Sequence, residues 1–336
     1  MHPEMSLVFL TLFAGVGQGI FIALVILTGI YSGSLDEKTV YISLIVSIIF
    51  QYIGSVASLF HLGNPQRMWK AVRMWRQSWL SREALALGGF TGLIHLYLGL
   101  YYLGQRGDLL FYTGILAVIF SLGFFLSSSM LYAKIRFIRE WHNPFTTVNF
   151  TLSGLFGGSA FIYAILLFTN GLPQGIDIVQ NTVIALGVVA FILKLLTFRF
   201  NSKVYVSVDL KHALGKNDPS IRLMDMGTSY GHYNTKEYYY PQTARQLTIQ
   251  KLAVIVLAFL IPLSIFFVTA EFSEIAFLKL PLSLGAVASL VIGYLIERRL
   301  FFIQGNHIQN LYYGNFKRNI TPNPILSQAR KGTPVP

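Results

Sequence analysis

Eight long apolar runs constrain this chain more than any other feature of its sequence. A helix needs about 20 apolar residues to cross the hydrocarbon core of a bilayer, where backbone polar groups must pair within the helix itself. The runs that meet this need lie at about residues 5–30, 40–62, 83–103, 109–135, 146–170, 178–198, 247–271 and 280–303. The sequence therefore predicts an all-α integral membrane protein, with a bundle of eight transmembrane helices over residues 1–303.

Composition supports this class. Only 12% of the residues are charged, whereas about 25% are charged in a typical soluble domain. The first run lacks the basic start and the small-residue cleavage site of a signal peptide, so we expect it to be a true span. The absence of cysteine excludes cysteine-ligated zinc and iron–sulfur clusters held by four thiolates. If electrons pass through this system, another chain carries the clusters.

The basic residues are distributed unevenly between the two ends of the predicted bundle. A net charge of +12 could also suit nucleic acid or anionic lipid, but in a membrane protein the placement of charge is more informative. Of the 26 Lys and Arg residues, all but Lys38, Arg106 and Lys279 fall at one end. The positive-inside rule predicts that this end is cytoplasmic. It carries both termini and the linkers 63–82, 136–145 and 199–246.

The linker between the second and third runs is basic and rich in tryptophan. Its large apolar residues recur at steps of three and four, which predicts an amphipathic helix over residues 66–79, lying in the membrane interface. These residues are Met68, Trp69, Val72, Trp75 and Trp79. Two interpretations remain open: the helix only anchors the chain to lipid, or it covers a cavity and presents a basic face to a partner.

His61 and Glu83 stand at the two ends of this linker. The two adjoining helices are antiparallel neighbours, so both residues lie at one depth and can reach one pocket. Ionisable groups at membrane depth are costly and usually functional, and the adjacent Arg82 strengthens the case. The alternative for His61 is a helix cap. Ser58, one turn from His61, is expected to line the same cavity.

Deeper polar residues on the second run have a simpler interpretation. Ser47, Gln51 and Ser55 fall on the face of Ser58 and His61 at helical periodicity. We expect the deeper members to form hydrogen bonds between helices, as small polar residues commonly do in membrane bundles.

A b-type haem held by two histidines is not expected. His61 and His95 alone fall within or at the end of a predicted span. His95 lies twelve residues into the third run, about 18 Å below its cytoplasmic end, whereas His61 lies at the lip. We therefore predict no haem and expect His95 to be a buried hydrogen-bonding residue.

A lipid-soluble quinone suits these residues. Quinone chemistry moves two electrons and two protons, so a site needs an apolar slot, a polar group at each carbonyl and a proton route to water. Histidine exchanges protons near neutral pH, and a carboxylate near the surface can relay them. Tyr132 and Trp141 lie at the same end of the predicted bundle as His61. Tyr132 could donate to a quinone carbonyl; an interfacial aromatic role is the alternative. His61 and Glu83 match this need, although their spacing is not diagnostic.

Three further predictions concern packing and partners. Glu297 with Arg298 and Arg299 favours a structural ion pair over catalysis. The tyrosine-rich segment 199–246 suits a protein interface, and the extended tail 304–336 is expected to wrap a partner.

Several of these segments resemble the membrane anchor subunits of DMSO-reductase-type molybdenum oxidoreductases, and most closely the branch of cytoplasmic sulfite dehydrogenase. The similar segments are HLGNPQR from His61, SWLSRE ending at Glu83, HPEMSLVFLTLFAGVGQG, MLYAKIRFIREWHNP and ERRLFFIQGNHIQNLYYG. The resemblance implies an eight-helix anchor in the bacterial inner membrane that reacts with ubiquinone or menaquinone and carries no haem. It also implies a four-cluster ferredoxin-like subunit and a molybdopterin catalytic subunit as partners, and a quinone role for His61 and Glu83.

Other classes compete with this interpretation. Within the family, the chain could anchor a quinol-oxidising DMSO or related reductase. A transporter is disfavoured, because the sequence shows no pair of broken helices in corresponding halves and few charges at mid-membrane depth. A purely structural tether would leave His61 as a cap. Neighbouring genes would separate these options, because a molybdopterin subunit without a twin-arginine signal would favour the sulfite branch.

Overall fold

The computed structural model describes residues 4–31, 33–60, 62–172, 174–207, 238, 240, 242–271 and 277–311. Within these residues eight helices are long and apolar enough to cross a membrane, which confirms the predicted all-α class. The first span joins α1 (Met5–Phe9), the π turn η1 (Leu10–Ala14) and α2 (Gly15–Ile30). The next spans are α3 (Glu37–Leu59), α4 (Trp79–Tyr102), α5 (Asp108–Ala133), α6 (Pro144–Thr169) and α7 (Ile176–Ser207). The seventh joins α10 (Ala244–Val254), η3 (Ile255–Leu260) and α11 (Ile261–Glu271), and the eighth is α12 (Lys279–Gln304).

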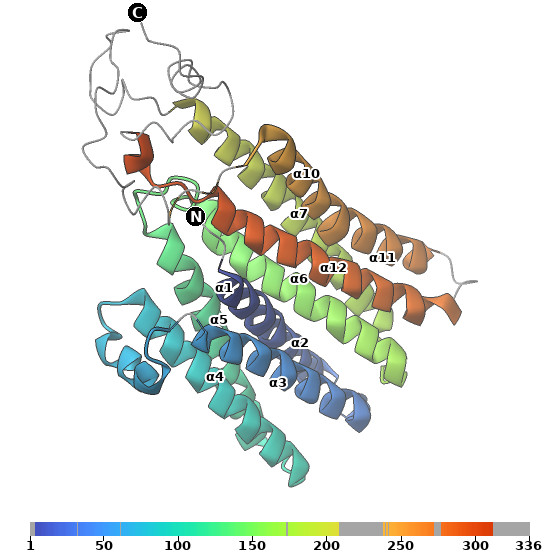
Figure 1. Cartoon of the computed structure of the whole chain (residues 1–336). Helices are drawn as coiled ribbons and strands as arrows, with labels where there is room; N and C mark the ends of the chain where they lie inside the picture. Colours follow the sequence, from blue (N-terminus) through green and yellow to red (C-terminus); the bar gives the residue numbers. More distant parts are fainter. Residues whose placement is uncertain are drawn as a thin grey trace, which may run out of the picture.

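The first span lies at the centre of the bundle, packed against α3, α5 and α6 (Figure 1). Its most apolar stretch is 78% buried, against 28% for α3 and α4. Glycines permit this close packing, since a Cβ at Gly19 would collide with the backbone of Gly154 and Gly158, and one at Gly17 would come within 2.9 Å of Ser47 O. Close approach at small residues is how helices gain dispersion contacts in lipid, where the hydrophobic effect does not drive them together.

Local signals fix where several spans begin. The Ser78 side chain accepts a hydrogen bond from the Ser81 N–H, and Asn143 caps α6, where Pro144 takes the first helical position. Both are preferred arrangements at helix N-termini. The Ser78 cap starts α4 at Trp79, four residues before the predicted start at Glu83, so Glu83 lies inside the helix rather than at its end.

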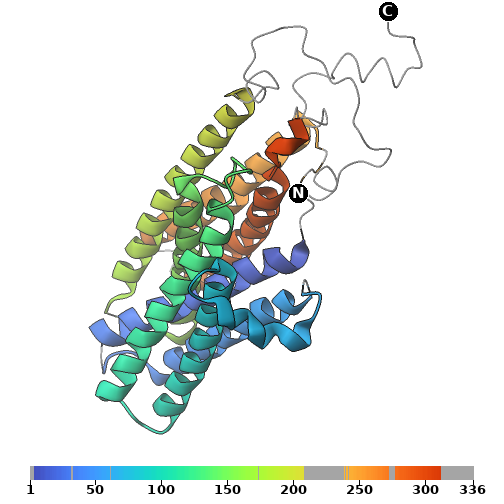
Figure 2. The same cartoon turned by 90° about the vertical axis from the view of Figure 1, so that its left-hand side faces the viewer.

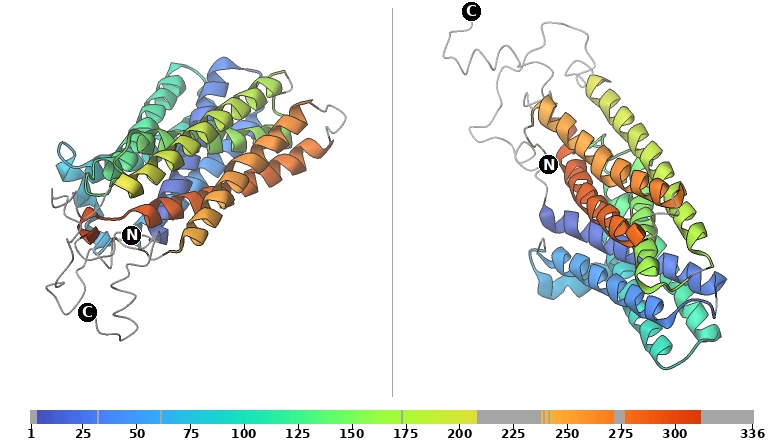
Figure 3. Two further views of the ribbon diagram at one scale, coloured as in Figure 1. Left: turned by 90° about the horizontal axis from the view of Figure 1, so that it is seen from above. Right: turned by 90° about the vertical axis from the view of Figure 1, so that its right-hand side faces the viewer.

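The basic end of the bundle is defined here as the end that carries Glu4, the 62–78 linker, the loop 134–143 and Gln304. Figure 3 shows the first residues and the end of α12 together at this end, as an even number of spans requires. A 3₁₀ turn, η5 (Ile308–Leu311), follows there. Most of the predicted interface segment 199–246 (208–237, 239 and 241) and all of the tail beyond 311 lie outside the described residues, so their predicted roles stay predictions.

The predicted amphipathic α-helix over 66–79 is wrong in form. Pro65–Met74 forms the 3₁₀ helix η2, which has no buried residue, and the linker lies beside the ends of α3 and α4 at the edge of the bundle (Figure 1, Figure 2). Cationic side chains lie over its indole rings, with Arg73 5.0 Å from the Trp69 centroid and Arg76 5.5 Å from that of Trp75. No other part of the described protein covers the apolar side chains of this segment. It therefore does not keep the α-helical period that their spacing indicated.

His95 also differs from its prediction. It is exposed on the outer face of α4 rather than buried. Its hydrogen bonding is confirmed, since Nδ1 lies 2.7 Å from Thr91 O and Nε2 lies 3.3 Å from the Tyr52 hydroxyl. The carbonyl of Thr91 can only accept, so Nδ1 carries the proton and Nε2 accepts from Tyr52. Two local partners satisfy the imidazole without burial.

Candidate functional site

Glu83 lies in the second turn of α4, about 6 Å below the start of the helix at 1.5 Å per residue. Its side chain is buried, with 6% of the residue exposed. One turn deeper, Ala86 belongs to an apolar cluster with Leu10, Ala14, Ile22, Phe124 and Phe125. A carboxyl group is thus held at the apolar wall between α4, α5 and the first span.

The polar neighbours of Glu83 come from α5. The Ser128 hydroxyl approaches the Glu83 carboxyl. Ser127 and Ser129 donate to carbonyls of their own helix, at 2.6 and 2.9 Å, whereas the Ser128 hydroxyl makes no such bond within the described structure. Ser128 is therefore the serine of this run whose polar atom remains available to the carboxyl.

Tyr132 follows Ser128 by one helical turn. Its hydroxyl feels the charges of both Glu83 and Arg298, and that of Glu4 more weakly. The ring packs at the basic end against four aromatic rings, with centroids 5.3 to 6.0 Å away. These rings belong to Trp141, Phe150, Phe301 and Phe302. Tyr132 thus lies within the electrostatic reach of Glu83, and its predicted role at the site stays a prediction.

Trp141 has a different position from the one expected of a ligand contact. It is 2% exposed, its Nε1–H donates to Phe301 O at 2.8 Å, and its ring lies against Gly305. Its single donor is already used to tie the loop after α5 to the end of α12. Its predicted quinone contact stays a prediction, with no polar group left to make it.

Arg82 and Ser58 also direct their polar atoms to backbone. Arg82 donates to Trp75 O at 2.9 Å and to Arg76 O at 2.8 Å, and its guanidinium stacks 4.3 Å from the Trp79 centroid. Ser58 donates to Ser55 O at 2.6 Å. Arg82 thus closes the end of the linker onto α4. His61 lies outside the described residues, so its place in the site stays a prediction.

The interhelical bonds predicted for the deeper polar face of α3 are confirmed. Ser47 Oγ donates to Gly17 O at 2.7 Å, and Gln51 Nε2 donates to Thr91 Oγ1 at 3.0 Å. Gln18 Nε2 donates in turn to Gln51 Oε1 at 3.3 Å. These buried amides join the first span, α3 and α4 below the candidate site.

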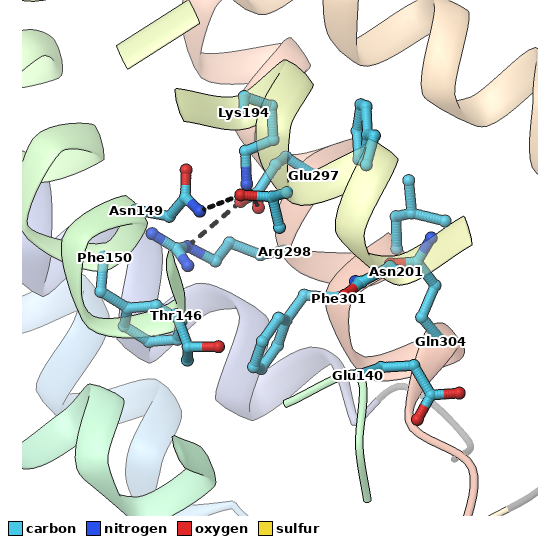
Figure 4. Close-up of a pocket in the computed structure, with 13 residues that line it drawn as sticks. Glu140, Thr146, Asn149, Phe150, Lys194, Asn201, Glu297, Arg298, Phe301 and Gln304 are labelled. Atoms are coloured by element: carbon cyan, nitrogen blue, oxygen red, sulfur yellow. Dashed lines mark hydrogen bonds and ion pairs between the residues drawn. The ribbon is translucent and has the colours of Figure 1, made fainter. Parts of the chain in front are cut away.

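A buried cluster of charged residues surrounds Glu297, and the sequence predicted only part of it. The predicted ion pair of Glu297 exists, with Arg298 Nε 3.5 Å from Glu297 Oε2, but Lys194 Nζ is closer, 2.5 Å from Glu297 Oε1 (Figure 4). Arg298 also donates to Ser153 Oγ, and its guanidinium lies 3.9 Å from the Phe150 centroid. Lys194, Glu297 and Arg298, called the ion cluster below, are each at most 6% exposed. A lysine inside an apolar run was the available signal for this cluster.

A small cavity of about 20 Å³ adjoins the ion cluster. Figure 4 shows it between α6, α7 and α12, with Glu140 and Gln304 on the side away from the charges. Glu297 Oε2, Arg298 Nε and Asn201 Oδ1 have no hydrogen-bond partner within the described part of the chain. A polar cavity above about 10–15 Å³ can hold a water molecule, so the cluster can be hydrated.

Comparison with known proteins adds two findings. The family model described as DMSO reductase anchor subunit (DmsC) matches residues 1–314. The chain is also similar to one of the subunits of the sulfite dehydrogenase of Allochromatium vinosum, with 30% identity over 332 residues that cover 93% of this chain and 99% of that relative.

Proposed function

The chain belongs to the family of DMSO reductase anchor subunits, and from this premise we propose that it is the quinone-reactive membrane subunit of a molybdopterin and iron–sulfur oxidoreductase. It is a multi-pass membrane protein, and an anchor subunit works with catalytic and electron-transfer subunits. In the proposal these partners are a molybdopterin protein and a four-cluster ferredoxin-like protein. Electrons pass between the partner's clusters and the quinone pool through the site at Glu83.

Sulfite oxidation coupled to quinone reduction is the reaction that the comparison favours. The similar protein of Allochromatium vinosum belongs to a sulfite dehydrogenase and is matched over nearly its whole length. The basic residues gather at one end of the helix bundle. By the positive-inside rule this end faces the cytoplasmic side of the bacterial inner membrane. The partners would then dock on the cytoplasmic side. A quinol-oxidising reductase anchor and a non-redox tether are the competing functions.

One observation carries the proposal. A buried carboxyl, Glu83, lies one or two turns below the basic end; among the described residues the Ser128 hydroxyl is near it and the Tyr132 hydroxyl is within its electrostatic reach. A carboxylate that served only structure would be expected to pair with a cation at this depth. No salt bridge reaches Glu83 within the described residues.

The residues present fit a quinone headgroup. A bound quinone would supply two-electron, two-proton chemistry. Glu83 can hold a proton at its carboxyl, and the nearby Ser128 hydroxyl, which has no hydrogen-bond partner within the described residues, is free to orient toward it. Tyr132 can donate its hydroxyl hydrogen, and the apolar cluster around Ala86, Phe124 and Phe125 excludes water. The predicted role of His61 is a hydrogen bond to a quinone carbonyl.

The test uses the assembled complex with two electron acceptors. Glu83→Gln keeps the shape of the side chain but cannot carry a proton, and His61→Ala removes the imidazole. Quinone turnover should fall by about 10²–10⁴-fold, the usual range for general acid–base help. Turnover with an artificial carrier that reacts at the partner subunits should be unchanged. Normal quinone turnover in the assembled Glu83→Gln complex would reject the site, and equal loss with both acceptors would favour the tether.

Two simpler measurements test the remaining proposals. The purified chain should show no haem Soret band and no iron–sulfur absorption; a stoichiometric b-type spectrum would contradict this. A topology reporter fused after Pro336 should report the cytoplasm, because nearly all basic residues share that end. A periplasmic signal would show that the predicted orientation is reversed. The distribution of basic residues would then no longer favour the sulfite dehydrogenase branch.

A further inference from the structure

The ion cluster is costly, and packing alone does not account for it. Two cations and one carboxylate meet about 10 Å inside the membrane, since Glu297 lies seven residues before the end of α12. Apolar residues of similar volume would often stabilise such a position at least as well. Ionisable residues inside membranes usually mark functional paths. The cluster is separate from the Glu83 carboxyl and has no role in the function proposed above.

The cluster is incompletely bonded on the side of the cavity. Glu297 Oε1 is bonded to Lys194, whereas Glu297 Oε2 accepts no hydrogen bond within the described structure. Arg298 Nε and Asn201 Oδ1 are also without hydrogen-bond partners there. Glu297 Oε2 is held only by the 3.5 Å ion pair with Arg298, and a carboxylate oxygen without a hydrogen bond beside a cavity large enough for water is a position where a proton can be bound.

The cavity leads from the cluster toward the basic end. Its lining runs from Lys194 and Glu297 to Asn201 and then to Glu140 and Gln304 (Figure 4). Asn201 Nδ2 donates to Gln304 Oε1 at 3.4 Å, and Gln304 is the last residue of α12. Polar groups therefore continue from the buried carboxylate to the membrane surface on the side where both ends of the described bundle lie.

The cluster is electrostatically linked to the candidate quinone site. Tyr132 feels the charges of Glu83 on one side and Arg298 on the other. The Phe150 ring, which packs on Tyr132, also carries the Arg298 guanidinium. The Tyr132 ring and the Arg298 guanidinium thus pack on the same Phe150 ring, which places Tyr132 between the Glu83 side and the ion cluster.

Several other titratable or charged groups surround Glu297. From α7 comes Lys194, and from α12 come Arg298 and the buried Tyr294. Lys251 of α10 and Lys194 both lie over the Phe198 ring, with their Nζ atoms 5.7 and 5.9 Å from its centroid. Glu140 lines the far part of the cavity. With two cations in contact, Glu297 is an ionised carboxylate at rest, and an added proton is favoured only when negative charge appears nearby.

We propose that Glu297, within the buried ion cluster, is a redox-linked proton-binding site that takes a proton through the Asn201 cavity when electrons reach the Glu83–Tyr132 site. The step is the association of one proton from the basic side with the Glu297 carboxylate, with no bond to quinone. The proton leaves by the same route when the charge is removed. The inference rests on the proposed function, because quinone reduction supplies the charge.

Infrared difference spectra of the whole complex, recorded as its quinone is reduced, provide the test. A protonated Glu297 gives a carboxyl band, which should disappear in Lys194→Gln/Glu297→Gln. That double substitution keeps the net charge of the cluster and avoids two unpaired buried cations. Glu37→Gln, in an exposed ion pair at the opposite end, is the matched control and should leave the band intact.

Two further substitutions on α7 test the route. Asn201→Leu should slow the appearance of the band by about tenfold or more, because it replaces the polar step of the cavity with an apolar side chain. Gln180→Leu removes another buried amide of the same helix, one that donates to Phe266 O and Thr269 Oγ1 at the other end. It should leave the rate of the band unchanged.

The outcomes separate the two proposals. A band that persists in the double variant, or a wild-type complex that reduces quinone without any Glu297 band, overturns this inference and leaves the function proposed for Glu83 intact. A wild-type complex that does not react with quinone overturns both. Equal slowing in Asn201→Leu and Gln180→Leu shows that the cavity is not the route and also counts against the inference.

Discussion

The two glutamates buried near the basic end have opposite surroundings. Glu83 lies beside two neutral hydroxyl groups, those of Ser128 and Tyr132. Glu297 lies between Lys194 at 2.5 Å and Arg298 at 3.5 Å. Identical side chains at similar depth are thus placed in an uncharged pocket and in a pocket with two cations.

The difference shows how the same residue type serves two tasks. A carboxyl without a cation partner in an apolar pocket can gain or lose a proton without breaking an ion pair, which suits direct exchange with a ligand. A carboxylate held between cations also joins helices, here α7 to α12, and removing it leaves buried charges uncompensated. Stability and proton chemistry should therefore respond differently at the two positions.

The largest expected effect is on stability at Glu297. Glu297→Leu leaves Lys194 and Arg298 buried without their carboxylate, so it should cost about 3–5 kcal/mol and sharply reduce the amount of folded protein. Fluorescence-detected gel filtration after a heat series measures this. The double variant Lys194→Gln/Glu297→Gln should recover most of the loss. A single variant as stable as wild type would show that the ion pairs do not hold α7 to α12.

The same change at Glu83 should have a small effect on stability. Glu83→Leu breaks no ion pair and fills an apolar pocket beside Ala86, so we expect a change below about 1 kcal/mol. Quinone turnover should nevertheless be lost. Thermal stability and quinone turnover should both be measured on the same preparation. A loss of stability as large as that of Glu297→Leu would show that the two pockets do not differ as described.

An intermediate effect is expected at Tyr132, whose hydroxyl lies in the field of both sites. Tyr132→Phe keeps the ring contacts with Trp141 and Phe150 but removes one donor. Quinone turnover should fall about 5–10-fold, the value of one hydrogen bond, with unchanged thermal stability. Steady-state kinetics with quinone and with an artificial acceptor separate this from a defect in the partners. Unchanged quinone kinetics would remove Tyr132 from the site.

A smaller effect is expected at Trp141, in the aromatic layer between the pockets. Trp141→Phe loses the bond from Nε1 to Phe301 O, which should cost about 1 kcal/mol. Quinone turnover should be unchanged, because the indole donor is already used by the backbone. A fall in turnover at constant stability would instead support the ligand contact that the sequence suggested.

The smallest effect is expected far from both pockets. Arg106, in the loop after α4, and Glu37, the first residue of α3, form an exposed pair at 3.1 Å at the end of the bundle opposite the basic end. Glu37→Gln should change stability by less than about 0.5 kcal/mol, because solvent screens such pairs. A loss of stability comparable to that of Glu297→Leu would show that burial does not determine how much an ion pair contributes to stability.

The sequence was informative wherever the signal was local. Runs of apolar residues predicted all eight spans, with bounds within a few residues except at the end of α7, and the spacing of polar residues on α3 predicted the bonds made by Ser47 and Gln51. The start of α4 differs from its prediction because the Ser78 cap begins the helix four residues before the predicted start at Glu83. The fold is predictable to this extent because each span must satisfy its own backbone.

The remaining features depend on contacts between distant segments. Lys194 and Glu297 are 103 positions apart, and no local pattern joins them. The apolar run predicted a span that ends near residue 198, whereas α7 continues to Ser207. The exposure of His95 likewise depends on how α4 is rotated against its neighbours, which single-sequence periodicity does not fix. Of the candidate site, Glu83 and Tyr132 could be named in advance, but Ser128 could not.

The central position of the first span also has a consequence for biogenesis. The segment that leaves the ribosome first is the one that the finished protein encloses most completely, and the glycines of α6 that receive Gly19 are made more than a hundred residues later. Gln18, by contrast, bonds to Gln51 of the next span, so the first two spans can pair before α6 is made. The first two spans must wait in lipid while three more helices, α4, α5 and α6, are translated, and this time sets the earliest moment at which the first span can be enclosed.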